Sequence, residues 1–146
     1  MEFEGDIIVP AARQFVFDEM QKPEMIQKIL PNCESVEKVE DNKYVAILNE
    51  KVSKISMKLE TELEIVEIHE PDLVKLTITG EAPGSNTSTH GTATFKLSEA
   101  GEETRIQYTM DIEVSGKLAS IGFRMIKHVA KKRIDEIGSN LKTVFQ

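Results

Sequence analysis

The side chains of this 146-residue chain that could do chemistry are three histidines and one cysteine. His69 precedes Glu70 and could exchange protons with it, but neighbouring residues on a strand point to opposite faces, so a solvated turn is the favoured interpretation. His90 lies among Gly, Ser and Thr residues and His128 lies in a helical segment, so no two histidines have the spacing of metal ligands. The sequence predicts no catalytic group and no metal site.

Cys33 is the only cysteine and has no partner for a disulfide within the chain, which fits a reducing compartment. The carboxylate of Glu34 beside it would raise its pKa, so a packing thiol is favoured over a nucleophile. The segment 80–91 contains glycines, but no lysine or helix follows its last glycine, so it does not predict a phosphate site. A mobile flap over a cavity and a plain hairpin loop remain alternative interpretations of this segment.

Charge is unevenly distributed along the chain. The net charge is −7, and residues 1–115 carry −12 whereas residues 116–146 carry +5. The acidic body repels phosphates, so nucleic acid is not expected as a partner. The basic tail could contact an anionic membrane surface or an acidic partner, and a purely solubilising role is an equal alternative. The candidate residues of this surface are Arg124, Lys127, Lys131 and Lys132.

Alternation of apolar and polar residues dominates the middle of the chain and predicts strands. It is clearest from Ile55 to Ile65, where apolar residues and one threonine alternate with serine, lysine and glutamate. Short turn sequences separate the predicted strands, so antiparallel neighbours in a meander are expected. The seven predicted strands cover residues 2–9, 34–39, 43–50, 55–65, 73–79, 91–97 and 104–114.

Three helices are expected around this sheet. Pro10 and Pro23 suit the first turns of two short helices that end near Met20 and Pro31. A long helix is expected over residues 117–145, with an apolar stripe that includes Phe123 and is widest in its first half. The wide first half must contact more than the sheet, such as a cavity, a lid or a partner.

This order of elements is that of the α+β helix-grip fold, in which a curved seven-stranded antiparallel sheet closes around one long C-terminal helix in a single domain over residues 1–146. A strongly curved sheet cannot fill the enclosed space with its own side chains, so an apolar cavity is expected, with a fully packed α+β sandwich as the alternative. The apolar faces include the polar tips of Thr61 and Tyr108, which could orient a ligand. The predicted ligand-binding residues are Leu59, Thr61, Leu63, Ile78, Phe95, Tyr108, Met110, Ile121, Met125 and Val129.

Three stretches resemble the G-subunit family of carbon monoxide dehydrogenase, which belongs to the START-like (SRPBCC) superfamily. They are LPNCESVE at 30–37, GTATFKL at 91–97 and TRIQYTMDIEVSGKLASIGFRMI at 104–126. Asn32 stands where the family usually has glycine after the proline, and asparagine also tolerates a left-handed backbone. Members often carry a C-terminal extension proposed to help membrane attachment, whereas this sequence ends at Gln146.

The resemblance implies a non-catalytic accessory protein of the cytoplasm and the inner membrane face, without a cofactor of its own. Its implied partners are a hydrophobic small molecule, such as a lipid, isoprenoid or quinone, and a molybdenum-containing dehydrogenase that it helps to recruit or mature. Two alternatives stay open: a polyketide cyclase or dehydratase-like enzyme, which requires an acid or base inside the cavity, and an interaction module without a ligand.

Overall fold

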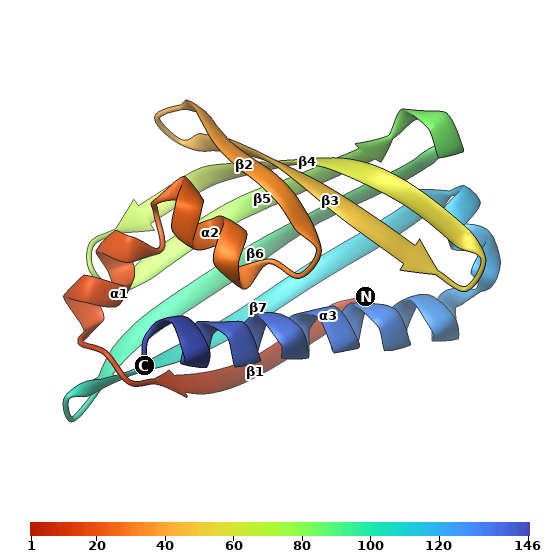
Figure 1. Ribbon diagram of the computed structural model, residues 1–146. Coiled ribbons are helices and arrows are strands. Elements are labelled where there is room, and N and C mark those ends of the chain that lie inside the picture. The colour runs from red at the N-terminus through yellow and green to blue at the C-terminus, as the bar shows by residue number, and fades with distance from the viewer.

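A seven-stranded antiparallel sheet wraps around the C-terminal helix in the computed structural model, which describes residues 1–146 (Figure 1). The strand order is β1-β7-β6-β5-β4-β3-β2, so β2 to β7 form a meander and β1 joins its far edge. This confirms the predicted helix-grip fold. The strands are β1 (Glu2–Val9), β2 (Cys33–Glu40), β3 (Lys43–Val52), β4 (Ile55–His69), β5 (Leu73–Ala82), β6 (Thr87–Ala100) and β7 (Glu103–Gly116).

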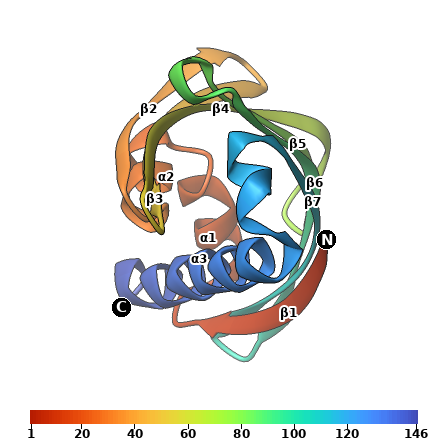
Figure 2. The ribbon, with the colours of Figure 1, turned by 90° about the vertical axis from the view of Figure 1, so that its right-hand side faces the viewer.

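The predicted alternation assigns the two faces of the sheet. On β4, Met57, Leu59 and Thr61 are buried while the lysine and glutamate between them are exposed. Register pairs carry the same alternation across the other strands, because directly opposite residues share a face. The sheet is concave toward the helices, as the end-on view in Figure 2 shows. The buried strand residues cluster with residues of the helices and therefore lie on this concave side, which is called the inner face below.

Two short helices follow β1, as predicted. Helix α1 spans Arg13–Glu19 and starts three residues later than predicted, because Pro10 lies before the helix instead of in its first turn. Helix α2 spans Pro23–Ile29 with its proline at the start, where a missing N–H costs no hydrogen bond. Asn32 follows with φ 58°, the left-handed conformation expected for asparagine there.

The C-terminal segment is not one continuous helix. A 3-10 helix, η2 (Lys117–Ile121), precedes α3 (Phe123–Val144), and Gly122 between them has φ 98°, which interrupts the helical backbone. Hydrophobic periodicity continues across this glycine, so the break is invisible in the polarity pattern. The apolar stripe was also wrong at Phe123, which is 65% exposed.

The predicted loop at 80–91 is mostly strand. Strand β5 continues to Ala82 and β6 begins at Thr87, leaving only the short 3-10 helix η1 (Pro83–Ser85) and Asn86 as the connection. The flap interpretation is therefore wrong for most of this segment. This segment is rich in small residues and threonines, which are typical of turns. In the structure, most of them occupy strand positions in the middle of the sheet.

Thirteen of the buried apolar residues form two separate clusters at opposite ends of the sheet, one of 8 and one of 5 residues. The first joins α1, α2 and the end of α3 to β1, β6 and β7, and contains Val16, Phe17 and Phe145. The second joins η2 to β3, β4 and β5 through Leu118, Val52 and Met57. The middle of the inner face belongs to neither buried cluster.

Candidate functional site

The middle of the inner face is apolar but incompletely buried. Two rows of register partners cross it between the core clusters, and only Ala93 of these residues is fully buried. Apolar side chains that remain half-exposed on the concave side of a sheet border a space that water can enter. The first row is Leu63, Ile78, Gly91 and Ile112, and the second is Ile65, Leu76, Ala93 and Met110.

The helices leave this region uncovered. Helix α3 has its main contacts with α2, β1 and η2, while α1 contacts β6 and β7. No helix has its main contacts with β4 or β5, the two central strands of the meander. The inner face of these two strands is therefore the candidate position for an external apolar molecule.

The predicted ligand-binding residues divide into three groups. Leu59 and Thr61 are buried, and Leu59 belongs to the second core cluster. Met125 is 46% exposed and belongs to neither cluster. The other seven are half-buried, with Phe95 packed against the first cluster and Ile121 and Val129 against the second. Leu63, Ile78, Tyr108 and Met110 belong to neither core cluster and are packed against neither.

The hydroxyl groups of Thr61 and Tyr108, which were predicted to orient a ligand, have no hydrogen-bond partner within the protein. The hydroxyl of Tyr44, by contrast, donates to the carbonyl oxygen of Gln21 at 2.6 Å, and burial raises the pKa of Tyr44. No buried side-chain oxygen in the chain lacks a partner, so the hydroxyls of Tyr108 and Thr61 must reach accessible space. The ring of Tyr108 lies against the backbone of Gly5, where a Cβ atom would be 2.6 Å from its hydroxyl oxygen.

An ion pair between β3 and α3 was missed by the sequence interpretation. The guanidinium of Arg133 donates from Nε to both carboxylate oxygens of Glu50, at 3.0 and 3.2 Å, and from a second nitrogen to Glu136 at 3.1 Å. The hydrogen bond to Glu50 raises the pKa of Arg133. Position 50 continues the inner-face alternation of Tyr44, Ala46 and Leu48. This alternation is the sequence signal that could have predicted Glu50 on the inner face. The ion pair links α3 directly to β3.

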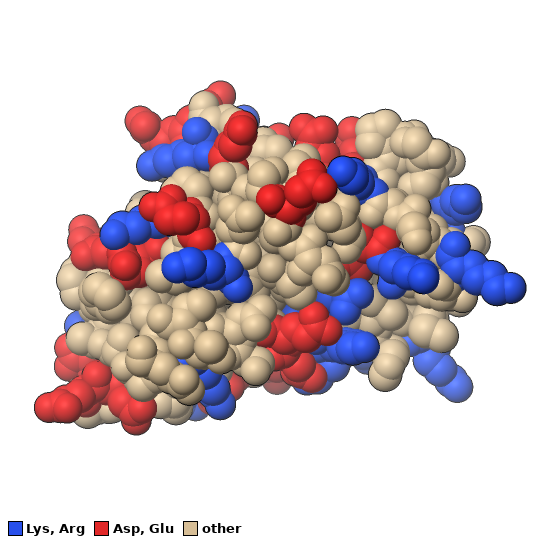
Figure 3. Space-filling view, viewed as in Figure 1, with Lys and Arg blue, Asp and Glu red and all other residues tan.

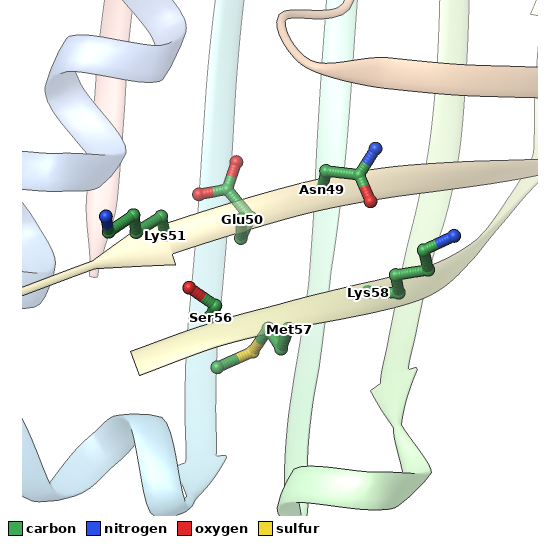
Figure 4. A pocket seen from close by; sticks show the side chains of 6 residues that line it. All are labelled: Asn49, Glu50, Lys51, Ser56, Met57 and Lys58. Carbon is green, nitrogen blue, oxygen red and sulfur yellow. The ribbon is translucent and has the colours of Figure 1, made fainter. Parts of the chain in front are cut away.

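Two hollows on the outer face are polar. One, of about 390 Å³, lies along the β3–β4 hairpin and has Met57 as its single apolar lining residue (Figure 4). The other, of about 490 Å³, lies on β1, β6 and β7 and is lined mainly by carboxylates and threonines. The alternating side chains that line them, such as Lys58 and Thr92, are on the face opposite the core. Neither hollow is the apolar space predicted from the sequence.

The candidate acid and base residues lie away from the inner face. His69 is exposed and pairs with Glu67 at 3.0 Å, not with Glu70, and Asp111 is exposed on the outer face beside the N-terminal amine. The thiol of Cys33 donates to the carbonyl oxygen of Ser35, and burial raises its pKa. No group of three or more His, Cys, Asp or Glu residues is placed to hold a metal ion.

Basic and apolar residues are exposed together where α3 begins. Phe123 and Met125 are 65% and 46% exposed there. Lys131 forms an ion pair with Asp135 at 2.8 Å, which raises its pKa, but the other three predicted surface residues form no ion pair. Figure 3 shows Lys and Arg gathered at this end of the molecule. We call it the basic end; its unpaired exposed members are Lys51, Lys54, Lys117, Arg124, Lys127 and Lys132.

No helix of the chain is both long enough and apolar enough to cross a bilayer.

Comparisons with known proteins agree with this architecture. Residues 5–146 match the family model for the G subunit of carbon monoxide dehydrogenase (CoxG). A conserved protein from Geobacillus kaustophilus is 26% identical with a TM-score of 0.89, and the alignment covers 99% of this chain and 95% of that one. No curated protein matches the chain.

Two more distant structures share the fold. A START superfamily protein from Mycobacterium smegmatis has 12% identity and a TM-score of 0.74, covering 99% of this chain and 96% of its own. The Zhui aromatase/cyclase from Streptomyces sp. R1128 has 13% identity and a TM-score of 0.72, covering 98% and 92%. The same architecture thus occurs in an aromatase/cyclase as well as in the CoxG family.

Proposed function

The chain belongs to the CoxG family, named for the G subunit of carbon monoxide dehydrogenase, and on this premise we propose that it is an accessory protein that binds a lipophilic small molecule between its curved sheet and α3. The observation that carries the proposal is the half-exposed apolar middle of the inner face, with the unpartnered hydroxyls of Thr61 and Tyr108. The lining proposed here is the half-buried group around Leu63, Ile78, Tyr108 and Met110.

The free energy available from an apolar ligand is sufficient for binding. Burying about 400 Å² of an apolar ligand contributes about 10 kcal/mol before the losses of association, which is enough for micromolar affinity. Polar groups then mainly orient the ligand. A lipid, isoprenoid or quinone meets this description.

Native mass spectrometry of the purified full chain tests this proposal. We expect a bound neutral molecule that organic solvent releases, and saturable binding of decylubiquinone after the natural ligand is removed. A ligand-free mass under gentle ionisation, together with no saturable binding of decylubiquinone, would rule the proposal out.

An accessory role beside a molybdenum-containing dehydrogenase is the biological context that the family supports. The aromatase/cyclase of the same fold keeps a catalytic role as the alternative. Catalysis would need an acid or base at the ligand, and the candidates His69 and Asp111 face away from the inner space. The position of these residues therefore favours binding over catalysis.

The basic end is proposed to contact the anionic surface of the cytoplasmic membrane. Its cations lack acidic partners, and the exposed side chains of Phe123 and Met125 can enter the headgroup region. Each basic group near an anionic surface contributes about 1 kcal/mol. Segment η2, which covers one end of the inner face, belongs to this same basic end, and this position supports exchange of a lipophile with the bilayer.

Reversing two charges tests this contact. The double variant K127E/K132E is expected to bind vesicles that contain phosphatidylserine about 10-fold or more weakly, because two attractive charges become repulsive. Vesicle co-sedimentation measures the effect, and added salt should weaken the wild type in the same way. The control K96E/K142E changes net charge equally at the other end of the molecule. Equal losses in the two double variants would show that only net charge matters.

A further inference from the structure

The inner face carries a pair of hydroxyls, of which the sequence pattern indicated only that of Thr61. Thr61 on β4, Gly80 on β5 and Thr89 on β6 are register partners in one row across the sheet. A Cβ atom on Gly80 would overlap the Oγ1 of Thr89 and lie 3.3 Å from the Oγ1 of Thr61. Both hydroxyls therefore point over the bare backbone of Gly80 from opposite sides.

Other inner-face threonines have partners. The hydroxyl of Thr104 donates to the carbonyl oxygen of Ala11 at 2.7 Å. The hydroxyl of Thr87 donates to the carbonyl oxygen of Ser85 and accepts the N–H of Leu118. These two threonines fix the ends of the sheet to the segments that cover them. Thr61 and Thr89 lie between those ends, and neither hydroxyl hydrogen-bonds within the protein.

The burial of Thr61 shows where its hydroxyl points. The residue is 93% buried, yet no buried side-chain oxygen in the chain lacks a partner. The small accessible part of Thr61 must therefore include its hydroxyl. A polar group that is desolvated on most sides and has no partner loses free energy that a ligand atom can restore.

The surroundings restrict the chemistry of that ligand atom. No charged side chain occupies an inner-face position between Met57 and Ile65 on β4 or between Thr87 and Leu97 on β6. A carboxylate or ammonium group would lose its hydration there without gaining a free counter-ion, because the inner-face residue Glu50 is already paired with Arg133. Two hydroxyl donors match a carbonyl oxygen, which accepts two hydrogen bonds. The site therefore suits an uncharged head that carries a carbonyl group.

The same rows indicate the direction of the ligand body. Phe95, the register partner of Tyr108, lies six residues along β6 from Thr89, which corresponds to about 20 Å of strand. The two half-buried apolar rows of the candidate site lie between these positions. A ligand whose head binds at Thr61 and Thr89 can lay an apolar chain along these rows toward Tyr108.

We propose that Thr61 and Thr89, on either side of Gly80, hydrogen-bond the carbonyl oxygen of an uncharged lipophile whose apolar chain lies along β5 and β6. This inference rests on the proposed function, since it names the head group that the apolar space receives. It assigns Thr89 and Gly80 to the site in addition to Thr61.

Laurdan, a fluorescent ketone with a dodecanoyl chain, is a suitable probe because its emission moves to longer wavelength when its carbonyl accepts hydrogen bonds. In the double variant T61V/T89V we expect binding about 10-fold weaker or more, from the loss of two hydrogen bonds, and emission at shorter wavelength. The variant T61S/T89S keeps both hydroxyls and should retain affinity and emission. Thr79→Val, on the outer face of β5, is the matched control.

Gly80→Ala provides an independent variant, because its methyl group occupies the space between the two hydroxyls. It should weaken laurdan binding while circular dichroism reports a folded chain. Unchanged affinity and emission in T61V/T89V, or full binding in Gly80→Ala, would overturn the hydroxyl pair while leaving the apolar site intact. Absence of saturable laurdan binding to the wild type would overturn both the pair and the proposed function.

Discussion

Gly116→Ala should destabilise the protein by roughly 3–5 kcal/mol, the largest loss expected from any glycine substitution in the chain. Gly116 has φ 84° and ψ −147°, a conformation that is essentially restricted to glycine. A methyl group there would also overlap the carbonyl oxygen and carbon of Asn86, which are backbone atoms that cannot rotate away. Conformational strain and overlap therefore act together at one position.

The backbone of Asn86 and Gly116 cannot separate without loss of further contacts. The N–H of Lys117 donates to the carbonyl oxygen of Asn86 at 2.8 Å, and the N–H of Leu118 donates to the hydroxyl of Thr87 at 3.2 Å. Leu118 in turn belongs to the second core cluster. Displacement at Gly116 would therefore open the end of the sheet that η2 closes.

Urea denaturation followed by circular dichroism measures this effect, with two glycines as controls. Gly101 has φ 66° but no atom near a Cβ position, so Gly101→Ala should cost only about 1–2 kcal/mol. Gly84 has neither a positive φ nor a close neighbour, so Gly84→Ala should be nearly neutral. A loss in Gly116→Ala no greater than that in Gly101→Ala would show that the overlap with Asn86 is relieved at no cost.

The sheet could be predicted from the sequence because alternation is a local signal. Residues 55–65 show the two faces of β4 directly. Every predicted strand is present: β1 has the predicted bounds, and the other six are longer by one to four residues at one or both ends. Helix boundaries were harder to predict, since Gly122 breaks the helix through its backbone conformation and not through its polarity. The exposure of Phe123 follows from that break, because η2 turns the chain before α3 begins.

The candidate site could be predicted only in part. Thr61 and Tyr108 were recognisable as polar members of apolar alternations. Thr89 was hidden because its segment has the composition of a turn, and its role depends on the bare backbone of Gly80 in the neighbouring strand. Such a role arises from the register between strands, which a single strand pattern does not contain. The Glu50–Arg133 pair depends likewise on where α3 crosses the sheet.

Ile78→Trp should lower laurdan affinity at least about 100-fold and leave the melting temperature unchanged or higher, a combination that only a hollow interior allows. Ile78 lies in the first apolar row, opposite Gly91 on β6. The indole would occupy the space that the ligand needs. In a filled core the same substitution would cost about 1–3 kcal/mol through overpacking. A hollow interior thus predicts lost binding with preserved stability, whereas a filled core predicts lost stability.

The neighbouring residue supplies the control for this experiment. Thr79→Trp adds a large side chain to the exposed outer face of β5 and should leave laurdan affinity unchanged. Fluorescence titration gives the affinities and thermal denaturation gives the stabilities of both variants. A lower melting temperature with intact binding in Ile78→Trp would place the ligand elsewhere and mean that the chain's own side chains fill the interior. Lost binding with preserved stability would locate the ligand between β5 and α3, because the indole at position 78 is the only difference between the variant and the wild type.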